Sequence, residues 1–205
     1  MLEFVGVSIM IKFKNNVDNI CEYQTSILPD KVTIIKTPKS VEEMMKISFP
    51  IAIILCLIMF ITIFIKTLLA KTVVISPIML MVGLLIGFSL LIIHEWLHAV
   101  IYPKNATVTI GRLKGKLTFV ALASYPLKRN RFILMCLFPF LLGIIPLIIF
   151  IVSPIELKSI NGLMFGMACI GMISPYPDVY NVITVLRVAN TDDKIIFFKD
   201  DMYKL

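Results

Sequence analysis

The stretch Leu91-Ile92-Ile93-His94-Glu95-Trp96-Leu97-His98 contains the H-E-x-x-H pattern of zinc peptidases inside a strongly apolar segment. These two histidines are the only ones in the chain. On a helix, residues four apart share one face, so both imidazoles can reach one metal ion. Glu95 is then placed to act as a general base on a water molecule. Because three such groups are costly in an apolar segment, the stretch predicts a membrane-embedded metallohydrolase. A pair of packed or interfacial histidines is the alternative interpretation.

The composition indicates an integral membrane protein. The chain has 205 residues, of which 59% are hydrophobic and 16% are charged. A soluble domain is about half apolar and about one quarter charged. The net charge of +7 comes from basic residues that flank apolar runs and do not alternate with aromatic residues. This pattern is typical of a lipid bilayer partner with oriented loops and excludes nucleic acid as the expected partner.

Four apolar segments are each long enough to cross a bilayer, which takes about 20 residues. They are about Ile47–Ile65, Val73–Tyr102, Phe132–Val152 and Ile160–Val188. The expected fold is therefore an all-α integral membrane protein with about four transmembrane helices and a small cytoplasmic β-hairpin loop. The second and fourth segments each carry a G-x-x-x-G pattern, which predicts that these two segments pack together. The glycines are Gly83 and Gly87, and Gly162 and Gly166.

The positions of the apolar segments divide the chain into three consecutive parts. Residues 1–46 form a polar N-terminal cytoplasmic segment, residues 47–189 a membrane-embedded metalloprotease domain, and residues 190–205 a polar C-terminal tail. In the first part, β-favouring residues at Phe4–Phe13 and Lys31–Ile35 predict a short strand or two. The order Ser40-Val41-Glu42-Glu43 predicts a capped helix start.

The segment 103–131 sets the expected orientation. It contains seven basic residues and no acidic residue, so the positive-inside rule places it in the cytoplasm. With four spans, both termini then lie in the cytoplasm too, and the H-E-x-x-H lies near the same face. Within the segment, Thr107–Ile110 and Leu117–Val120 predict a β-hairpin. The hairpin is either a surface feature without a role or an edge that pairs with an extended substrate.

A catalytic zinc site needs a third protein ligand beside the two histidines. Among the 13 acidic residues, only Glu95 and Asp178 fall within the apolar segments, and Glu156 falls in a short loop on the opposite side. Asp178 is therefore the expected third ligand. It follows Pro175-Tyr176-Pro177, which breaks the fourth segment, and irregular backbone at membrane depth is tolerated where it lines a cavity. A helix N-cap is the alternative role for Asp178. Asn181 could donate a hydrogen bond to a substrate oxygen or serve only in helix packing.

These residues resemble a known family. A polar segment with Leu28-Pro29, a span ending in the H-E-x-x-H, a basic loop, a span with Leu137-Phe138-Pro139-Phe140 and a late Asp178 are similar to the zincin peptidases of the DUF3267 type. That family looks like the site-2 protease class of intramembrane metalloproteases. The resemblance implies zinc held by His94, His98 and Asp178, with Glu95 as the base. Site-2 proteases carry a glycine after the aspartate, whereas Val179 follows Asp178 here.

The sequence therefore predicts an intramembrane zinc metalloprotease that hydrolyses peptide bonds of a membrane protein or peptide. It would be a multi-pass protein of the cell membrane, with both termini and the active site toward the cytoplasm. Two other functions stay open. One is a proton- or metal-coupled transporter, because membrane histidines and carboxylates also serve as proton relays. The other is a non-catalytic scaffold with a closed structural metal site.

Overall fold

The computed structural model describes residues 10–23, 28–38, 40–115, 118–199 and 201–205. The chain forms two compact units, each assembled from separate stretches of sequence. We call them the sheet unit and the helical unit. The sheet unit comprises Met1–Ile47, Glu95–Phe138 and Asn181–Leu205, and the helical unit comprises Ser48–His94 and Pro139–Tyr180.

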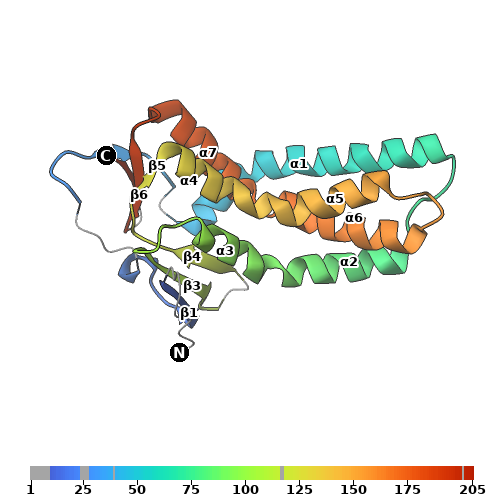
Figure 1. The fold of residues 1–205 in the computed structure, drawn as a ribbon, viewed down its shortest axis with the longest axis horizontal. Coiled ribbons are helices and arrows are strands. Elements are labelled where there is room, and N and C mark those ends of the chain that lie inside the picture. Colours follow the sequence, from blue (N-terminus) through green and yellow to red (C-terminus); the bar gives the residue numbers. More distant parts are fainter. Residues whose placement is uncertain (1–9, 24–27, 39, 116–117, 200) are drawn as a thin grey trace. The chain divides into compact units, whose positions relative to one another are not determined.

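The helical unit exposes large apolar side chains along most of its helices. Its elements are most of α1 (Val41–Ala70), α2 (Pro77–Ser89), α5 (Leu141–Val152) and α6 (Lys158–Ile173), coloured cyan to orange in Figure 1. α1 begins as predicted, because the Ser40 hydroxyl accepts a hydrogen bond from the Glu43 amide at 3.1 Å. A helix that is apolar all round is stable in lipid or in a large core. Exposed residues such as Leu69 at 78% and Ile78 at 75% favour lipid here.

Glycines bring α2 and α6 into close contact, which confirms the predicted pairing of the second and fourth segments. A Cβ added to Gly83 would lie 2.2 Å from the Leu163 carbonyl oxygen, and one added to Gly166 would lie 2.4 Å from the Leu80 carbonyl oxygen. Both neighbours are backbone atoms, so a side chain at either position would push the helices apart. Close backbone approach through small residues is a common way for membrane helices to pack.

Lys66 joins α1 to the end of α5 within the helical unit. Its ammonium group donates to the carbonyl oxygens of Phe150 and Ser153, the latter at 2.8 Å, and to the Asn161 side-chain oxygen at 3.0 Å. Asn161 is fully buried and donates in turn to the Pro154 carbonyl at 2.8 Å. The last carbonyls of a helix lack partners inside the helix, so one lysine satisfies the end of α5.

The sheet unit contains two small sheets around its own core. In the first, β3 pairs in parallel with β1 and antiparallel with β4. The predicted hairpin is therefore confirmed over the described residues; Leu117 of that hairpin and residues 4–9 of the predicted N-terminal strand lie outside them. In the second, the strand order is β2-β7-β6-β5, with all pairs antiparallel. The first sheet consists of β1 (Met10–Val17), β3 (Thr107–Leu113) and β4 (Phe119–Leu122), and the second of β2 (Thr33–Ile35), β5 (Leu127–Lys128), β6 (Lys194–Phe198) and β7 (Asp201–Lys204).

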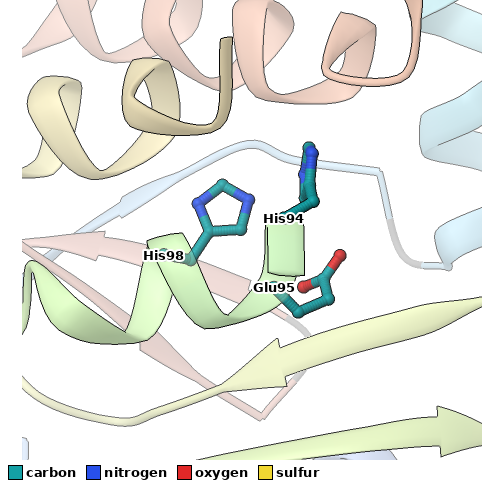
Figure 2. A group of neighbouring side chains, drawn as sticks. All are labelled: His94, Glu95 and His98. Atoms are coloured by element: carbon teal, nitrogen blue, oxygen red, sulfur yellow. The ribbon is translucent and has the colours of Figure 1, made fainter. Parts of the chain in front are cut away.

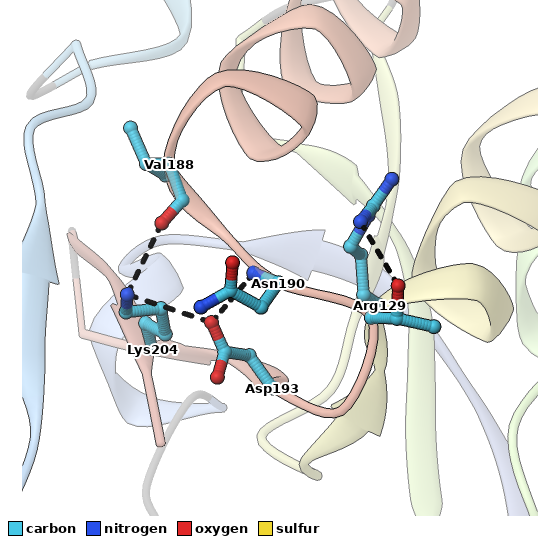
Figure 3. A network of polar contacts seen from close by, with 6 residues as sticks. Arg129, Val188, Asn190, Asp193 and Lys204 are labelled. Carbon is cyan, nitrogen blue, oxygen red and sulfur yellow. Dashed lines mark hydrogen bonds and ion pairs between the residues drawn. The ribbon is translucent and has the colours of Figure 1, made fainter.

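A polar network closes the end of α7 (Tyr176–Val188) in the sheet unit (Figure 3). The Lys204 ammonium donates to the carbonyl of Val188, the last residue of α7, at 3.1 Å, and pairs with the Asp193 carboxylate at 3.4 Å. Asp193 also accepts from the Asn190 amide at 2.7 Å. The C-terminal strand is therefore tied to the helix by a cation placed where the helix dipole is negative.

The expected all-α fold with four transmembrane helices is wrong. The described residues include seven strands in two sheets, and residues 190–205, expected to be a tail, form a hairpin with Ile195 and Met202 buried. These strands are two to eight residues long, and a period-2 hydrophobic pattern is hard to recognise over so few residues.

Among those residues, two helices are long and apolar enough to cross a membrane: Val41–Ala70 and the run Arg129–Val152. The second expected span is bent by 41° between α2 and α3 (Leu91–Val100) and counts as a third only if the bent pair is one span. The fourth breaks into α6 and α7 at the proline pair, and α6 has only 16 residues. The expected membrane location of residues 47–189, with residues 1–46 and 190–205 outside the membrane, stays a prediction.

Replacing Lys66 by Met is expected to destabilise the helical unit. The variant keeps the apolar length of the side chain but removes the donor for two carbonyls and for Asn161. Losing the donor of a buried acceptor costs about 1–3 kcal/mol. Thermal unfolding in detergent should show a lower midpoint for Lys66→Met than for Lys46→Met, a change at an exposed position of the same helix. Equal midpoints in the two variants would contradict the structural role of Lys66.

Candidate metal site

The short helix α3 carries both histidines and Glu95. Their metal-binding atoms, one from each residue, lie within 4.8 Å of one another. Both imidazoles are buried, with His94 at 6% and His98 at 7% exposure. Figure 2 shows the two rings projecting from one side of the helix, with the Glu95 carboxylate beside His94. The four-residue spacing thus produces the shared face expected from helical geometry.

A backbone carbonyl orients the His98 ring. His98 Nδ1 lies 2.8 Å from the carbonyl oxygen of Met135, in α4 (Arg129–Leu137) of the same unit. A carbonyl can only accept, so Nδ1 carries the proton and donates. The other nitrogen, Nε2, then has a lone pair for a metal ion. Histidine ligands of metals almost always make such a bond with the second ring nitrogen, which fixes both tautomer and orientation.

Asp178 lies next to His94, as the sequence analysis required of a third ligand. Its carboxylate oxygen is 3.4 Å from His94 Nε2, and both residues belong to the helical unit. Asp178 lies in the first turn of α7, which begins at Tyr176, and its amide donates to the Pro175 carbonyl at 3.0 Å. Asp178 therefore lies inside the helix, so the alternative N-cap role does not apply.

The distance between His94 and Asp178 fits two ligands of one zinc ion. A direct charge-assisted bond between an imidazolium and a carboxylate is about 2.7–2.9 Å long. Two ligand atoms at about 2.0–2.1 Å from a tetrahedral zinc ion lie about 3.3–3.4 Å apart. The observed 3.4 Å matches the second arrangement. Two imidazoles and one carboxylate are also a donor set that catalytic zinc sites use. The clustered metal-binding groups of the described residues are His94, Glu95 and His98, and Asp178 is placed against His94.

Two other polar residues of the sequence analysis, Glu156 and Asn181, differ in burial. Glu156 lies in the loop between α5 and α6 and is exposed, as the sequence analysis placed it outside the site. Asn181 is 9% exposed, and its side-chain oxygen has no hydrogen-bond partner in the part of the chain that the structure describes. Sequence reasoning missed Met135, because a backbone carbonyl leaves no residue type to search for.

The fold and the site define a zincin-like protein with long apolar helices. The H-E-x-x-H lies on the helix α3, the Asp178 carboxylate lies beside His94, and the Met135 carbonyl accepts a hydrogen bond from His98. Residues 87–192, about half of the chain, match the model of the family DUF3267, described as "Putative zincin peptidase". The chain belongs to this family. The matched range contains α3, Met135 and Asp178. No curated protein and no solved structure matches the chain. Membership of this family indicates that the protein is a metallopeptidase and that its metal is zinc.

Purified full-length protein is expected to bind one zinc ion per chain. His94→Ala and His98→Ala should lose it, because each removes one of three ligands. Asp178→Asn should bind zinc more weakly while keeping the shape of the side chain. Metal analysis and competition with a chelator would measure both effects, with Glu156→Gln as the matched control at an exposed position. Unchanged affinity in Asp178→Asn would exclude this aspartate as a ligand. A fourth protein ligand would instead indicate the closed site of a structural scaffold.

Proposed function

We propose that this protein is an intramembrane zinc metalloprotease that hydrolyses peptide bonds of membrane-associated proteins or peptides. The observation that carries the proposal is the arrangement at α3: His94 Nε2 lies at ligand spacing from Asp178, and His98 is oriented with Nε2 available to a metal. Glu95 lies within 4.8 Å of both histidine ligand atoms. Membership of a zincin peptidase family supports the same conclusion.

His94, His98 and Asp178 would hold the zinc ion, and Glu95 would move the proton. When bound, zinc acts as a Lewis acid that makes a water molecule more acidic and polarises a carbonyl. The Glu95 carboxylate accepts a proton from the attacking water as its oxygen bonds to the scissile carbon. Glu95 then donates this proton to the leaving amine as the carbon–nitrogen bond breaks. With three protein ligands, His94, His98 and Asp178 would leave room at the metal for water or substrate.

The helical unit would lie in the cell membrane and the sheet unit on its cytoplasmic side. Exposed apolar side chains on α1, α2 and α5 support the first placement. Sheet edges and loops need water or protein partners, which lipid cannot supply, and this supports the second. The sheet unit contains the N-terminus, the basic segment 103–131 and the C-terminus in one compact body. The positive-inside rule favours the cytoplasm for this basic segment and, with it, for both termini. The active site would face the same side, because α3 ends just before the basic segment.

A substrate segment would bind in an extended form. β4 is the last strand of its sheet, and no other strand pairs with its outer edge in the described residues. An edge strand offers unpaired backbone donors and acceptors to an extended peptide. Hydrolysis also requires an extended peptide, because the carbonyl of a helical residue is shielded and hydrogen-bonded. The proposed substrate is therefore a membrane protein with a segment that can unfold locally.

A transporter remains the second candidate because two helical segments are broken. α2 and α3 meet at a bend of 41°, and α6 gives way to α7 at Pro175. Discontinuous helices are typical of transporter binding sites. The two functions are distinguished by flux: a transporter reconstituted in liposomes would carry zinc or protons across the bilayer, and a protease would not. Family membership favours the protease.

Replacing Glu95 by Gln is expected to abolish cleavage but retain zinc. The amide cannot accept the proton from water, and general acid–base catalysis contributes about 10²–10⁴ in rate. The assay is cleavage of a library of apolar-segment peptides by the protein reconstituted in liposomes, with products identified by mass spectrometry. Glu156→Gln is the control and should cleave like the wild type. Cleavage at the wild-type rate by Glu95→Gln, with His94→Ala also active, would refute the proposal.

A further inference from the structure

Pro139 lies four residues after Met135 in the helical run Arg129–Val152. α4 ends at Leu137, and a 3-10 turn, η2 (Phe138–Phe140), connects it to α5. Pro139 lies in this turn and is fully buried. In an α-helix the amide of each residue donates to the carbonyl four residues earlier, so residue 139 would donate to Met135. Proline has no N–H, and this donor is therefore missing.

The carbonyl that Pro139 leaves without its helical donor is the one that His98 uses. The amide of Phe138, one residue before the proline, still donates to Leu134 in the regular helical pattern. The next carbonyl, that of Met135, accepts from His98 Nδ1 at 2.8 Å. Leu134 thus accepts from a helix amide, and Met135, four residues before Pro139, accepts from a side chain instead.

We propose that Pro139 is a positioning residue for the zinc site, which acts by keeping the Met135 carbonyl available to His98. This inference rests on the proposed function, since it assigns Pro139 a role in metal binding. A ring with its proton on Nε2 cannot offer that nitrogen to a metal. The bond to Met135 holds the proton on Nδ1 and so keeps Nε2 ready. Partners of this kind behind a metal ligand are worth about 10–100-fold in metal affinity.

A second proline in the same run provides a matched control. Pro146 lies inside α5, is buried, and removes the donor to the carbonyl of Leu142. The carbonyl that His98 Nδ1 contacts is that of Met135, which lies four residues before Pro139 and not before Pro146. Pro139→Ala and Pro146→Ala therefore make the same chemical change at two buried sites. Only the first returns an N–H that competes with His98.

The decisive experiment separates the missing N–H from the shape of the turn. Pro139→Ala restores both an ordinary side chain and an N–H. Lactic acid incorporated at position 139 of the full-length protein gives the same methyl side chain but an ester oxygen in place of the N–H. Zinc affinity, measured by chelator competition, should fall about 10–100-fold in Pro139→Ala. It should stay within about threefold of wild type in the lactic acid variant and in Pro146→Ala. An equal loss in the alanine and lactic acid variants, or no loss in either, would overturn the proposal.

A readout without zinc distinguishes failure of this inference from failure of the proposed function. The chain has only two histidines, so ¹⁵N-histidine labelling gives two rings, and His94→Asn assigns the remaining signals to His98. In zinc-free protein with neutral rings, His98 should carry its proton on Nδ1 in the wild type and in the lactic acid variant. Pro139→Ala should move the proton toward Nε2. If the wild type fails to bind zinc but these tautomers are found, the positioning role stands while the zinc function falls. A wild-type proton on Nε2 overturns the inference.

If Pro139→Ala does not fold, a second variant tests the proposal by weakening the Met135 carbonyl itself. An α-hydroxy acid at position 136 turns the Met135 carbonyl into an ester carbonyl, which is a weaker acceptor. The same shift of the His98 proton toward Nε2 is expected there. An unchanged tautomer in that variant would show that Met135 does not orient His98.

Discussion

The need to satisfy polar groups within an apolar environment governs this structure. A polar group that is buried away from water is costly unless it has a hydrogen-bond or metal partner. Regular helices pair most of their backbone groups internally, although Thr62 and Ser89 also donate to the carbonyls four residues earlier. Partners become available where a helix ends or breaks. Three polar side chains of this chain lie at such places: Lys66 at the end of α5, His98 against the carbonyl four residues before Pro139, and Asp178 just after the break between α6 and α7.

The same constraint explains why the sheets occur where they do. Every stretch that forms strands belongs to the sheet unit, and none belongs to the helical unit among the described residues. Strands in small sheets leave edges with unpaired amides and carbonyls, which water can satisfy. The core of this unit is formed by residues from all three of its stretches, including Ile35, Phe132 and Met202. The strand β2 and the C-terminal strands are therefore folded into the unit that carries Glu95 and His98.

The sequence predicted the site better than it predicted the fold. The H-E-x-x-H, with its helical spacing, placed both histidines on one face, because a local four-residue relation depends only on helix geometry. Asp178 was found by elimination, since so few carboxylates lie in apolar sequence, and the structure brings it to His94. The glycine patterns predicted the packing of α2 on α6, because small residues act through short-range contact. Whether these residues bind zinc stays a prediction.

The misses have a common physical cause. β1 pairs with β3 across almost a hundred residues, and β2 with β7 across more than 160, so no local pattern records either partner. No proline marks the bend between α2 and α3 in the sequence, whereas Pro175 marks the break before α7. Backbone partners are equally hidden, and Met135 could not be identified by its side chain. Pro139 shows how such a partner can be inferred: a proline inside an apolar helical run marks the carbonyl four residues earlier as an acceptor without its helical donor. In a buried core, where polar partners are few, that carbonyl is a place to look for a side-chain donor.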